Sequence, residues 1–219
     1  MATTRIVLVR HGEAQSHVDG VVGGRQGCSG LSDLGRRQAE ALRARWERTG
    51  EVADARALYA STLPRAVETA RIIAPALGDL DVVEVDELRE FDMGPEGDGL
   101  PWEEVEERFP TPEIWTPFHH HVPGAETWAS FGARVGAALD ELARRHVGET
   151  VVVACHGGVV EQSFTAFHSR PLSGWLGTVS IENCGITEWS HSERPDLPWV
   201  KARTWTLVRH NDHAHVPTA

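Results

Sequence analysis

The chain has 219 residues, 41% of them hydrophobic, and a formal net charge of −11 at pH 7. This length suits one domain with a sizeable core. The negative charge argues against broad binding to nucleic acids or anionic membranes, which requires an excess of basic surface. The three cysteines show no C-x-x-C spacing, no targeting segment is apparent, and no apolar run is long enough to span a membrane. We therefore expect a single domain over residues 1–219, located in the reducing cytoplasm.

The first predicted element is a strand over residues 5–9. This run is almost free of polar side chains and rich in β-branched residues, which is typical of a strand buried on both faces of a parallel sheet. Arg10 and His11 follow at its carboxyl end, where open α/β sheets bind their ligands. The pattern therefore indicates chemistry at Arg10 and His11 rather than packing.

A glycine-rich loop and a long helix come next. The loop covers residues 20–27, and the helix opens near residue 31 with Ser32 or Asp33 as its N-cap. The residues expected on one packing face are Leu34, Ala41, Leu42 and Trp46.

A second strand, over residues 57–61, leads into a helix that begins near Pro64, a residue suited to the first helical turn. Arg65 then lies near the helix N-terminus, where the macrodipole favours an anion. Pro75 is expected to kink or shorten this helix, and Gly78 to end it.

Alternating residues 81–85 predict a strand that is followed by Glu87 and Glu90. A carboxylic acid beside a phosphate site can supply the proton that a leaving oxygen needs, although most glutamates are simply solvated. Residues 91–124 are irregular apart from a short acidic helix that starts at Pro101. We expect this segment to form a cap over the carboxyl edge of the sheet and to select the substrate.

The histidines in and after this segment raise the question of a metal site. Neighbouring side chains rarely point at one ion, so structural or specificity roles are favoured over metal binding, and no metal is expected. The histidines concerned are His119, His120 and His121. Those near the C-terminus belong to a polar tail, at about residues 208–219, that we expect to be flexible.

A strongly amphipathic helix is predicted after Glu126, with its apolar stripe in the core. The stripe contains Trp128, Phe131, Val135, Leu139 and Leu142. A later helix over residues 159–167 and two strands, over 178–182 and 185–189, complete the predicted sheet. Asn183 falls in the turn between these strands and is assigned no catalytic role.

A buried strand over residues 150–155 repeats the pattern of the first strand, because it ends in His156 followed by glycines that let the backbone approach a ligand. Cys155 suggests a cysteine phosphatase, but the C-x5-R loop of that class requires arginine where this chain has Glu161. We interpret Cys155 as a small buried residue.

Two histidines and two arginines therefore follow the ends of three predicted strands, where they can meet in one pocket. Arginines and backbone donors bind phosphate or carboxylate, and the guanidinium fork suits either anion. The residues are Arg10, His11, Arg65 and His156.

Four sequence blocks in this order resemble the histidine phosphatase superfamily, also called the phosphoglycerate mutase-like family. They are R-H-G-E after the first strand, S-x-L-x-R-A-x-x-T-A at residues 61–70, L-R-E at 88–90 and H-G-G at 156–158, and the likeness spans roughly residues 4–190. The resemblance implies the phosphatase branch of the family, with a mostly parallel central sheet in a three-layer α/β/α fold. It implies no cofactor.

The resemblance also implies roles for the site residues. His11 is the nucleophile that forms a phosphohistidine, while Arg10, Arg65 and His156 surround the charged oxygens of the phosphoryl group. Glu90 is the acid that protonates the leaving alcohol. If Glu90 does not have this role, Glu87 is the fallback.

On the substrate side, the family's glycine-rich loop borders the phosphate pocket. We therefore expect substrate contacts from His17, Gly23, Gly24 and Gly157. The family usually has asparagine where this chain has His17, so His17 either donates the same hydrogen bond or makes the pocket titrate near neutral pH.

The predicted activity is metal-independent hydrolysis of a small phosphate monoester. The alternative of phosphoglycerate mutase-like transfer is less favoured, because the run that cofactor-dependent mutases have after R-H-G is not visible. A non-catalytic binder of phosphorylated ligands would be expected to have lost His11, His156 or Glu90, and all three are present. The identity of the ester and the oligomeric state, including a homodimer, stay open.

Overall fold

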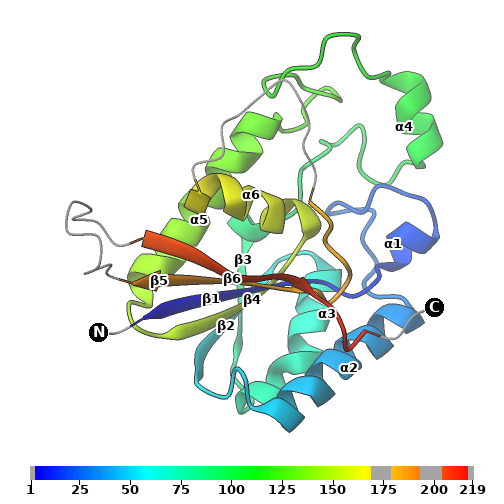
Figure 1. Ribbon diagram of the computed structural model, residues 1–219. Helices are drawn as coiled ribbons and strands as arrows, with labels where there is room; N and C mark the ends of the chain where they lie inside the picture. The colour runs from blue at the N-terminus through cyan, green and yellow to red at the C-terminus, as the bar shows by residue number, and fades with distance from the viewer. Residues whose placement is uncertain (1–2, 169–178, 193–203, 217–219) are drawn as a thin grey trace.

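The computed structural model describes residues 3–168, 179–192 and 204–216. Within these ranges, six strands form one sheet in the order β3-β2-β4-β1-β5-β6 (Figure 1). The strands β1 to β4 run parallel to one another, whereas β5 and β6 are antiparallel to their neighbours. The predicted, mostly parallel sheet is confirmed. Its strands are β1 (Thr4–Arg10), β2 (Ala55–Ser61), β3 (Val82–Val85), β4 (Thr150–Cys155), β5 (Ile186–Ser192) and β6 (Thr204–Asp212).

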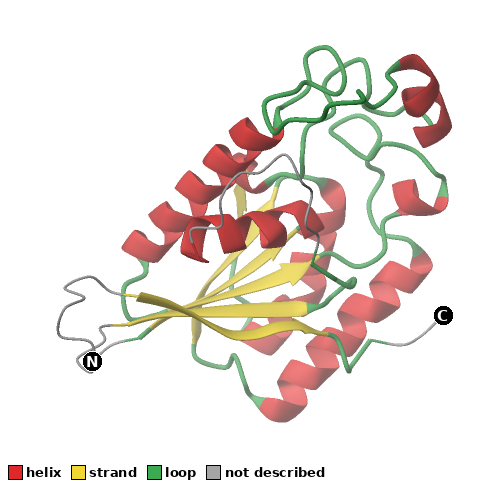
Figure 2. Cartoon of the chain, turned by 45° about the horizontal axis from the view of Figure 1, so that its top comes forward, coloured by secondary structure: helices red, strands yellow, loops and turns green. Residues whose placement is uncertain are grey.

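Helices cover both faces of the sheet, which confirms the three-layer α/β/α architecture (Figure 2). On one face lie α2 (Asp33–Thr49) and α3 (Pro64–Ile73). On the other lie α5 (Trp128–Arg145) and α6 (Gly157–His168). The shorter helices are α1 (Gln15–Val18), η1 (Ala74–Leu77), η2 (Asp86–Leu88) and α4 (Trp102–Arg108).

The strand β1 is buried on both faces, as its composition predicts. Successive side chains of a strand point to opposite faces, so Ile6 and Leu8 pack with α5 and α6, while Val7 and Val9 pack with α2 and α3. All four side chains are fully buried. Burial of each stabilises the fold by about 1.5–3 kcal/mol, and together they fix the position of the strand end where Arg10 and His11 lie.

Local signals set the ends of the helices. The Ser32 hydroxyl accepts a hydrogen bond from the Gly35 N–H (3.0 Å), which caps α2 as predicted. On the packing face of α2, Leu42 and Trp46 are buried, whereas Leu34 and Ala41 are only partly buried. As predicted, α3 stops before Pro75, and the following 3₁₀ turn ends at Gly78, which has a φ of 74°.

One predicted strand, over residues 178–182, is wrong where the structure describes it. Thr178 lies outside the described residues, and residues 179–182 form no regular structure. Their backbone groups bond to side chains instead of to a strand: the Ile181 carbonyl accepts from Arg10 Nη1 (2.5 Å), and the Glu182 N–H donates to Asn211 Oδ1 (2.7 Å). The segment therefore belongs to the active-site edge. The neighbouring strand predicted over 185–189 is confirmed as β5.

The prediction of a flexible tail at about residues 208–219 is also wrong for residues 208–216, which the structure describes. Residues 208–212 belong to β6, which pairs with β5. Beyond the strand, His215 Nε2 contacts the Cys184 carbonyl (3.1 Å) and Val216 packs against the core. Residues 217–219 lie outside the described part of the chain.

Ion pairs fasten this edge strand to α2. Asp212 in β6 accepts two hydrogen bonds from Arg45 in α2 (2.8 and 2.6 Å), and Arg209 pairs with Glu51 (2.5 Å) and Glu188 (3.0 Å). The Arg45 guanidinium holds the pKa of Asp212 well below its usual range. The folded protein therefore binds fewer protons than the unfolded chain once the pH falls below about 4.

We expect acid to weaken this attachment. Because the folded-state pKa of Asp212 is depressed, its contribution to stability is present above about pH 4 and is lost as the pH falls further. Asp212→Asn should lower the melting temperature at pH 7, and the difference from wild type should shrink towards pH 3. Thermal melts from pH 3 to 7 measure this, with Asp140→Asn, in an exposed pair with Arg144, as the control. A difference that does not depend on pH would contradict the assignment.

Candidate active site

The carboxyl ends of β1, β2 and β4 bring the predicted cationic and histidine residues together. Arg65 Nε lies 3.0 Å from His11 Nε2. The rings of His11 and His156 meet edge to face, with centroids 5.1 Å apart. All three side chains are at least 97% buried, so no bulk water screens their charges.

His11 is held in one tautomer. Its Nδ1 lies 2.6 Å from the Gly12 carbonyl, which can only accept, so Nδ1 has the proton and Nε2 offers its lone pair to Arg65. Burial, followed by the positive charge of Arg65, holds the pKa of His11 well below its usual range. At neutral pH the ring is therefore uncharged, with a nucleophilic Nε2.

The backbone around His11 is fixed by side chains far away in the sequence. The Gly12 N–H donates to Thr69 Oγ1 (3.1 Å), whose hydroxyl donates to the Arg65 carbonyl (2.8 Å). Asn183 Nδ2 donates to the His11 carbonyl (2.9 Å). Asn183 was expected to serve a turn only, and its hydrogen bond to the His11 backbone was missed because nothing local in the sequence indicates it.

His156 is positioned by Ser61 at the end of β2. The Ser61 hydroxyl accepts from the Leu63 N–H (3.2 Å) and lies 2.7 Å from His156 Nε2. The hydroxyl hydrogen is thus available for Nε2, which leaves the ring proton on Nδ1. That buried Nδ1 has no hydrogen-bond partner among the described residues, so it is available to an incoming anion.

Arg10 and Arg65 each use some of their N–H donors in hydrogen bonds within the protein. Arg10 donates to the Ile181 carbonyl (2.5 Å), and Arg65 donates to the Gly23 carbonyl (2.5 Å) as well as to His11. Burial lowers the pKa of Arg10, but a guanidinium stays charged at neutral pH. These contacts aim two positive groups at one region and link Arg65 to the glycine-rich loop.

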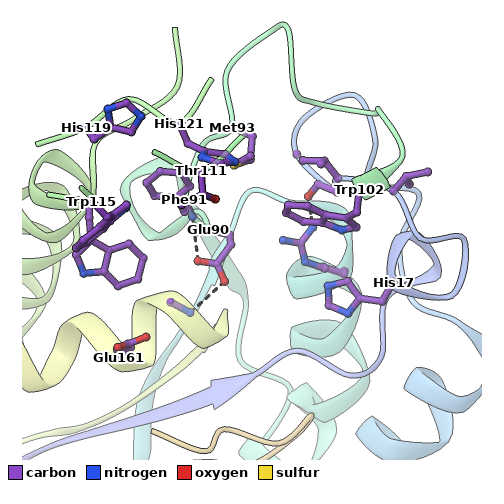
Figure 3. Close-up of a pocket in the computed structure, with 17 residues that line it drawn as sticks. His17, Glu90, Phe91, Met93, Trp102, Thr111, Trp115, His119, His121 and Glu161 are labelled. Atoms are coloured by element: carbon purple, nitrogen blue, oxygen red, sulfur yellow. Dashed lines mark hydrogen bonds between the residues drawn. The ribbon is translucent and has the colours of Figure 1, made fainter. Parts of the chain in front are cut away.

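Glu90 lies across from this cluster. Its Oε2 accepts from the Gly158 N–H (3.0 Å) and its Oε1 from its neighbour's N–H, that of Phe91 (2.9 Å), as Figure 3 shows. Glu87, the fallback for the acid, is exposed. The structure therefore places Glu90, and not Glu87, among the residues that line the pocket.

Arg134 in α5 holds the segment that contains Glu90. Its guanidinium donates to the carbonyls of Glu87 (2.6 Å), Arg89 (3.1 Å) and Glu90 (3.3 Å). Glu126 balances its charge through two hydrogen bonds of 2.7 Å. Sequence reasoning missed Arg134, because an arginine on the polar side of an amphipathic helix is usually solvated.

A pocket with a volume of about 590 Å³ opens above these groups (Figure 3). Of the predicted site residues, it is lined by His17, Gly23, Gly24, Arg65 and Glu90. Arg10, His11, His156 and Gly157 are not among its lining residues, but His11 contacts Arg65, which does line the pocket. Trp128, which was predicted to be core, lines the pocket. Further lining residues are Val21, Val22, Phe91, Met93, Trp102, Thr111, Trp115, His119, His121, Gly158 and Glu161.

His17, on the single turn α1, is close to His11, with 5.7 Å between the two ring centroids. Burial and the charges of Arg10 and Arg65 lower the pKa of His17 to about 4. The ligand-free ring is therefore neutral at pH 7 and retains one N–H donor. This argues against a pocket that titrates near neutral pH through His17.

Two other features of the sequence are placed by the structure. His119 and His121 line the pocket, whereas His120 Nδ1 bonds to the Ala125 carbonyl (2.7 Å). Among the described residues, no group of three or more His, Cys, Asp or Glu side chains is arranged to hold a metal ion.

Cys155 is fully buried, and burial raises its pKa, so it is a poor nucleophile.

The sequence model of the histidine phosphatase superfamily (branch 1) matches residues 6–210. The chain belongs to this superfamily. As a histidine phosphatase, it has the fold and the motif order that its sequence predicts. In the part of the chain that the structure describes, no helix is both long and apolar enough to cross a membrane.

Known proteins resemble nearly all of the chain. A metal-independent phosphoserine phosphatase of Arabidopsis thaliana is 35% identical over 213 residues, 94% of this chain and 83% of that protein. A probable phosphoglycerate mutase, GpmB of Yersinia enterocolitica, is 28% identical over 218 residues, 97% of this chain and 94% of that protein. The solved structure of Bacillus stearothermophilus YhfR has a TM-score of 0.78 at 27% identity, with 98% of this chain and all of that chain covered.

The absence of a side chain at Gly158 is required for the position of Glu90. A Cβ at this position would collide with Glu90 Oε1 and lie 2.9 Å from the ring of Phe131. We expect Gly158→Ala to lower kcat by about 10²-fold, because a displaced catalytic group costs this much. The control is Gly136→Ala, whose Cβ would make only an ordinary 3.8 Å contact with Ala166. Equal kcat values for the two variants would contradict the prediction.

Proposed function

We propose that this histidine phosphatase hydrolyses a small phosphate monoester through a phosphohistidine at His11, without a metal ion. The observation that supports this most is the neutral, buried His11, whose Nε2 is directed at a guanidinium while its Nδ1 is held by the Gly12 carbonyl. A nucleophile fixed in one tautomer beside cationic groups is the arrangement that phosphoryl transfer requires.

In the first step, the phosphate group of the ester displaces Arg65 from His11 Nε2 and binds among Arg10, Arg65 and the Nδ1–H of His156. These groups stabilise the negative charge on the transferred oxygens. Nε2 attacks phosphorus in line with the leaving oxygen, the P–O bond breaks, and protonated Glu90 gives its proton to the alcohol. The products of this step are the free alcohol and phosphohistidine.

In the second step, Glu90 takes a proton from a water molecule that attacks the phosphohistidine. Phosphate leaves, His11 regains its lone pair, and Glu90 is again protonated. Transfer to a second hydroxyl of a bound substrate, as in a mutase, would require that water be kept from the intermediate. The pocket beside Glu90 is open and spacious, which favours hydrolysis over transfer.

The deciding experiment is phosphate release from a panel of monoesters by wild type and His11→Ala, each with and without EDTA. The panel includes phosphoserine and 3-phosphoglycerate, because relatives are named for such compounds. We expect chelator-resistant release that the variant loses. Release that EDTA abolishes would overturn the metal-independent mechanism, and transfer to substrate without release would indicate a mutase.

Orthovanadate should inhibit competitively. It adopts the five-coordinate geometry of phosphorus under in-line attack, and the arginines and His156 that bind the phosphoryl group would bind it as well. Steady-state kinetics with increasing vanadate should raise KM and leave kcat unchanged. Indifference to both vanadate and inorganic phosphate would argue for a carboxylate ligand instead.

A further inference from the structure

Four large aromatic side chains from separate segments line the pocket above the catalytic cluster. Phe91 follows η2, Trp102 begins α4, Trp115 lies in the loop after it, and Trp128 begins α5. All four line the same pocket. Separate segments that all place a ring at one cavity indicate a binding surface and not a single packing contact.

Two of these rings, Phe91 and Trp128, are held by packing against a third ring. Phe91, Trp128 and the fully buried Phe131 form a cluster with centroid separations of 5.4 to 6.0 Å. Such offset and edge-to-face pairs hold rings in defined positions. The part of the pocket wall formed by Phe91 and Trp128 is thus present before a ligand arrives, which reduces the entropy lost on binding.

The position of Glu90 determines what these rings contact. In Figure 3, Trp102 and Trp115 lie on opposite sides of Glu90. The acid must reach the bridging oxygen of the ester, so the group attached to that oxygen extends into the space between the two indoles. The rings therefore contact the leaving alcohol and not the phosphate.

The charges in the pocket disfavour an alcohol that has a second anionic group. Among its described lining residues, Arg65 is the only arginine or lysine, and it contacts His11 at the phosphate end. A second anionic group on the substrate would thus find no guanidinium or ammonium partner from these residues. The groups that remain for hydrogen bonding near the rings include Thr111, His119 and His121.

We propose that the preferred substrates are monoesters of alcohols with a flat, apolar or aromatic body that binds between Trp102 and Trp115. This inference rests on the proposed phosphatase function and adds its substrate class. A volume of about 590 Å³ falls within the range of pockets that enclose molecules larger than a serine or glycerate ester.

The test compares 2-phenylethyl phosphate with ethyl phosphate and phosphoserine. The first two esters release primary alcohols of similar acidity, so a difference in kcat/KM reports contacts with the phenyl group. We expect kcat/KM to be at least about tenfold higher for 2-phenylethyl phosphate. Trp102→Ala and Trp115→Ala should lower it about tenfold for this ester and change the value for ethyl phosphate less than about twofold.

The control is Phe118→Ala, because Phe118 is in the same segment, is 69% exposed and does not line the pocket. It should change neither value. Equal kcat/KM for the two alkyl esters, or a tryptophan variant that lowers both alike, would overturn the inference and leave the phosphatase function intact. A preference for phosphoserine would also overturn it.

Binding separates this inference from the proposed function. Calorimetry with the His11→Ala variant measures the affinity for each ester without turnover. Tighter binding of 2-phenylethyl phosphate than of ethyl phosphate supports the aromatic site even if wild type releases no phosphate. Equal affinity rejects the site, whatever the activity.

Discussion

His11→Ala is expected to lower kcat by roughly 10⁴- to 10⁶-fold, the loss seen when a covalent nucleophile is removed. Alanine has no atom to attack phosphorus, and water cannot replace it, because the imidazole is 98% buried between Gly12 and Arg65. Single-turnover assays with the best ester of the panel measure the loss. Activity within tenfold of wild type would reject His11 as the nucleophile.

Two controls keep this result interpretable. His213→Ala removes an exposed histidine beyond β6 and should leave kcat unchanged. Acid-labile labelling of the protein by a ³²P-ester should disappear in the His11 variant only. A folded variant, judged by its melting temperature, that still becomes labelled would place the phosphoryl group on another residue.

Glu90→Gln is expected to lower kcat by roughly 10²- to 10⁴-fold, the usual contribution of a general acid. The amide is nearly isosteric, and its single oxygen can keep the hydrogen bond from the N–H of either Phe91 or Gly158, while the carboxylic proton donor is lost. KM should change little.

Glu87→Gln is the matched control. It is the same substitution three residues earlier, on a side chain that is exposed. Arg134 contacts the backbone carbonyl of Glu87, which the substitution leaves in place. Its kcat should match wild type. A large loss in Glu87→Gln together with a normal rate in Glu90→Gln would exchange the two roles. With esters of acidic alcohols, Glu90→Gln should release a rapid burst of alcohol, since such alcohols leave without a proton. Steady-state hydrolysis should stay slow, because the second step still lacks the Glu90 base.

The sequence predicts those parts of the site that depend on patterns of consecutive residues. A buried strand followed by Arg10 and His11, or by His156, is a local pattern, and the sheet then brings the strand ends together. The helix boundaries at Ser32 and Gly78 are local in the same way. The fold class and the family follow from such patterns.

The contacts that the sequence does not reveal join distant segments. Asn183 reaches the His11 carbonyl across 172 positions, and Arg134 reaches the Glu90 carbonyl across 44. Neither residue type is unusual where it occurs. The strand β6 was missed for a related reason: its stability comes partly from ion pairs with Arg45 and Glu51, which no pattern within the strand shows.

The two ends of the segment that lines much of the pocket are bonded to each other. Asp92 and Glu126 exchange backbone and side-chain hydrogen bonds (3.0 and 2.8 Å), directly beside the Glu126–Arg134 pair. Doubling the length of a loop with fixed ends raises the entropic free-energy cost of closing the loop by only about 0.6 kcal/mol. A change of length between these ends should thus reshape the pocket while Glu90 keeps its place, provided that Asp98 still accepts from the N–H groups of Gly24, Gln26 and Gly27.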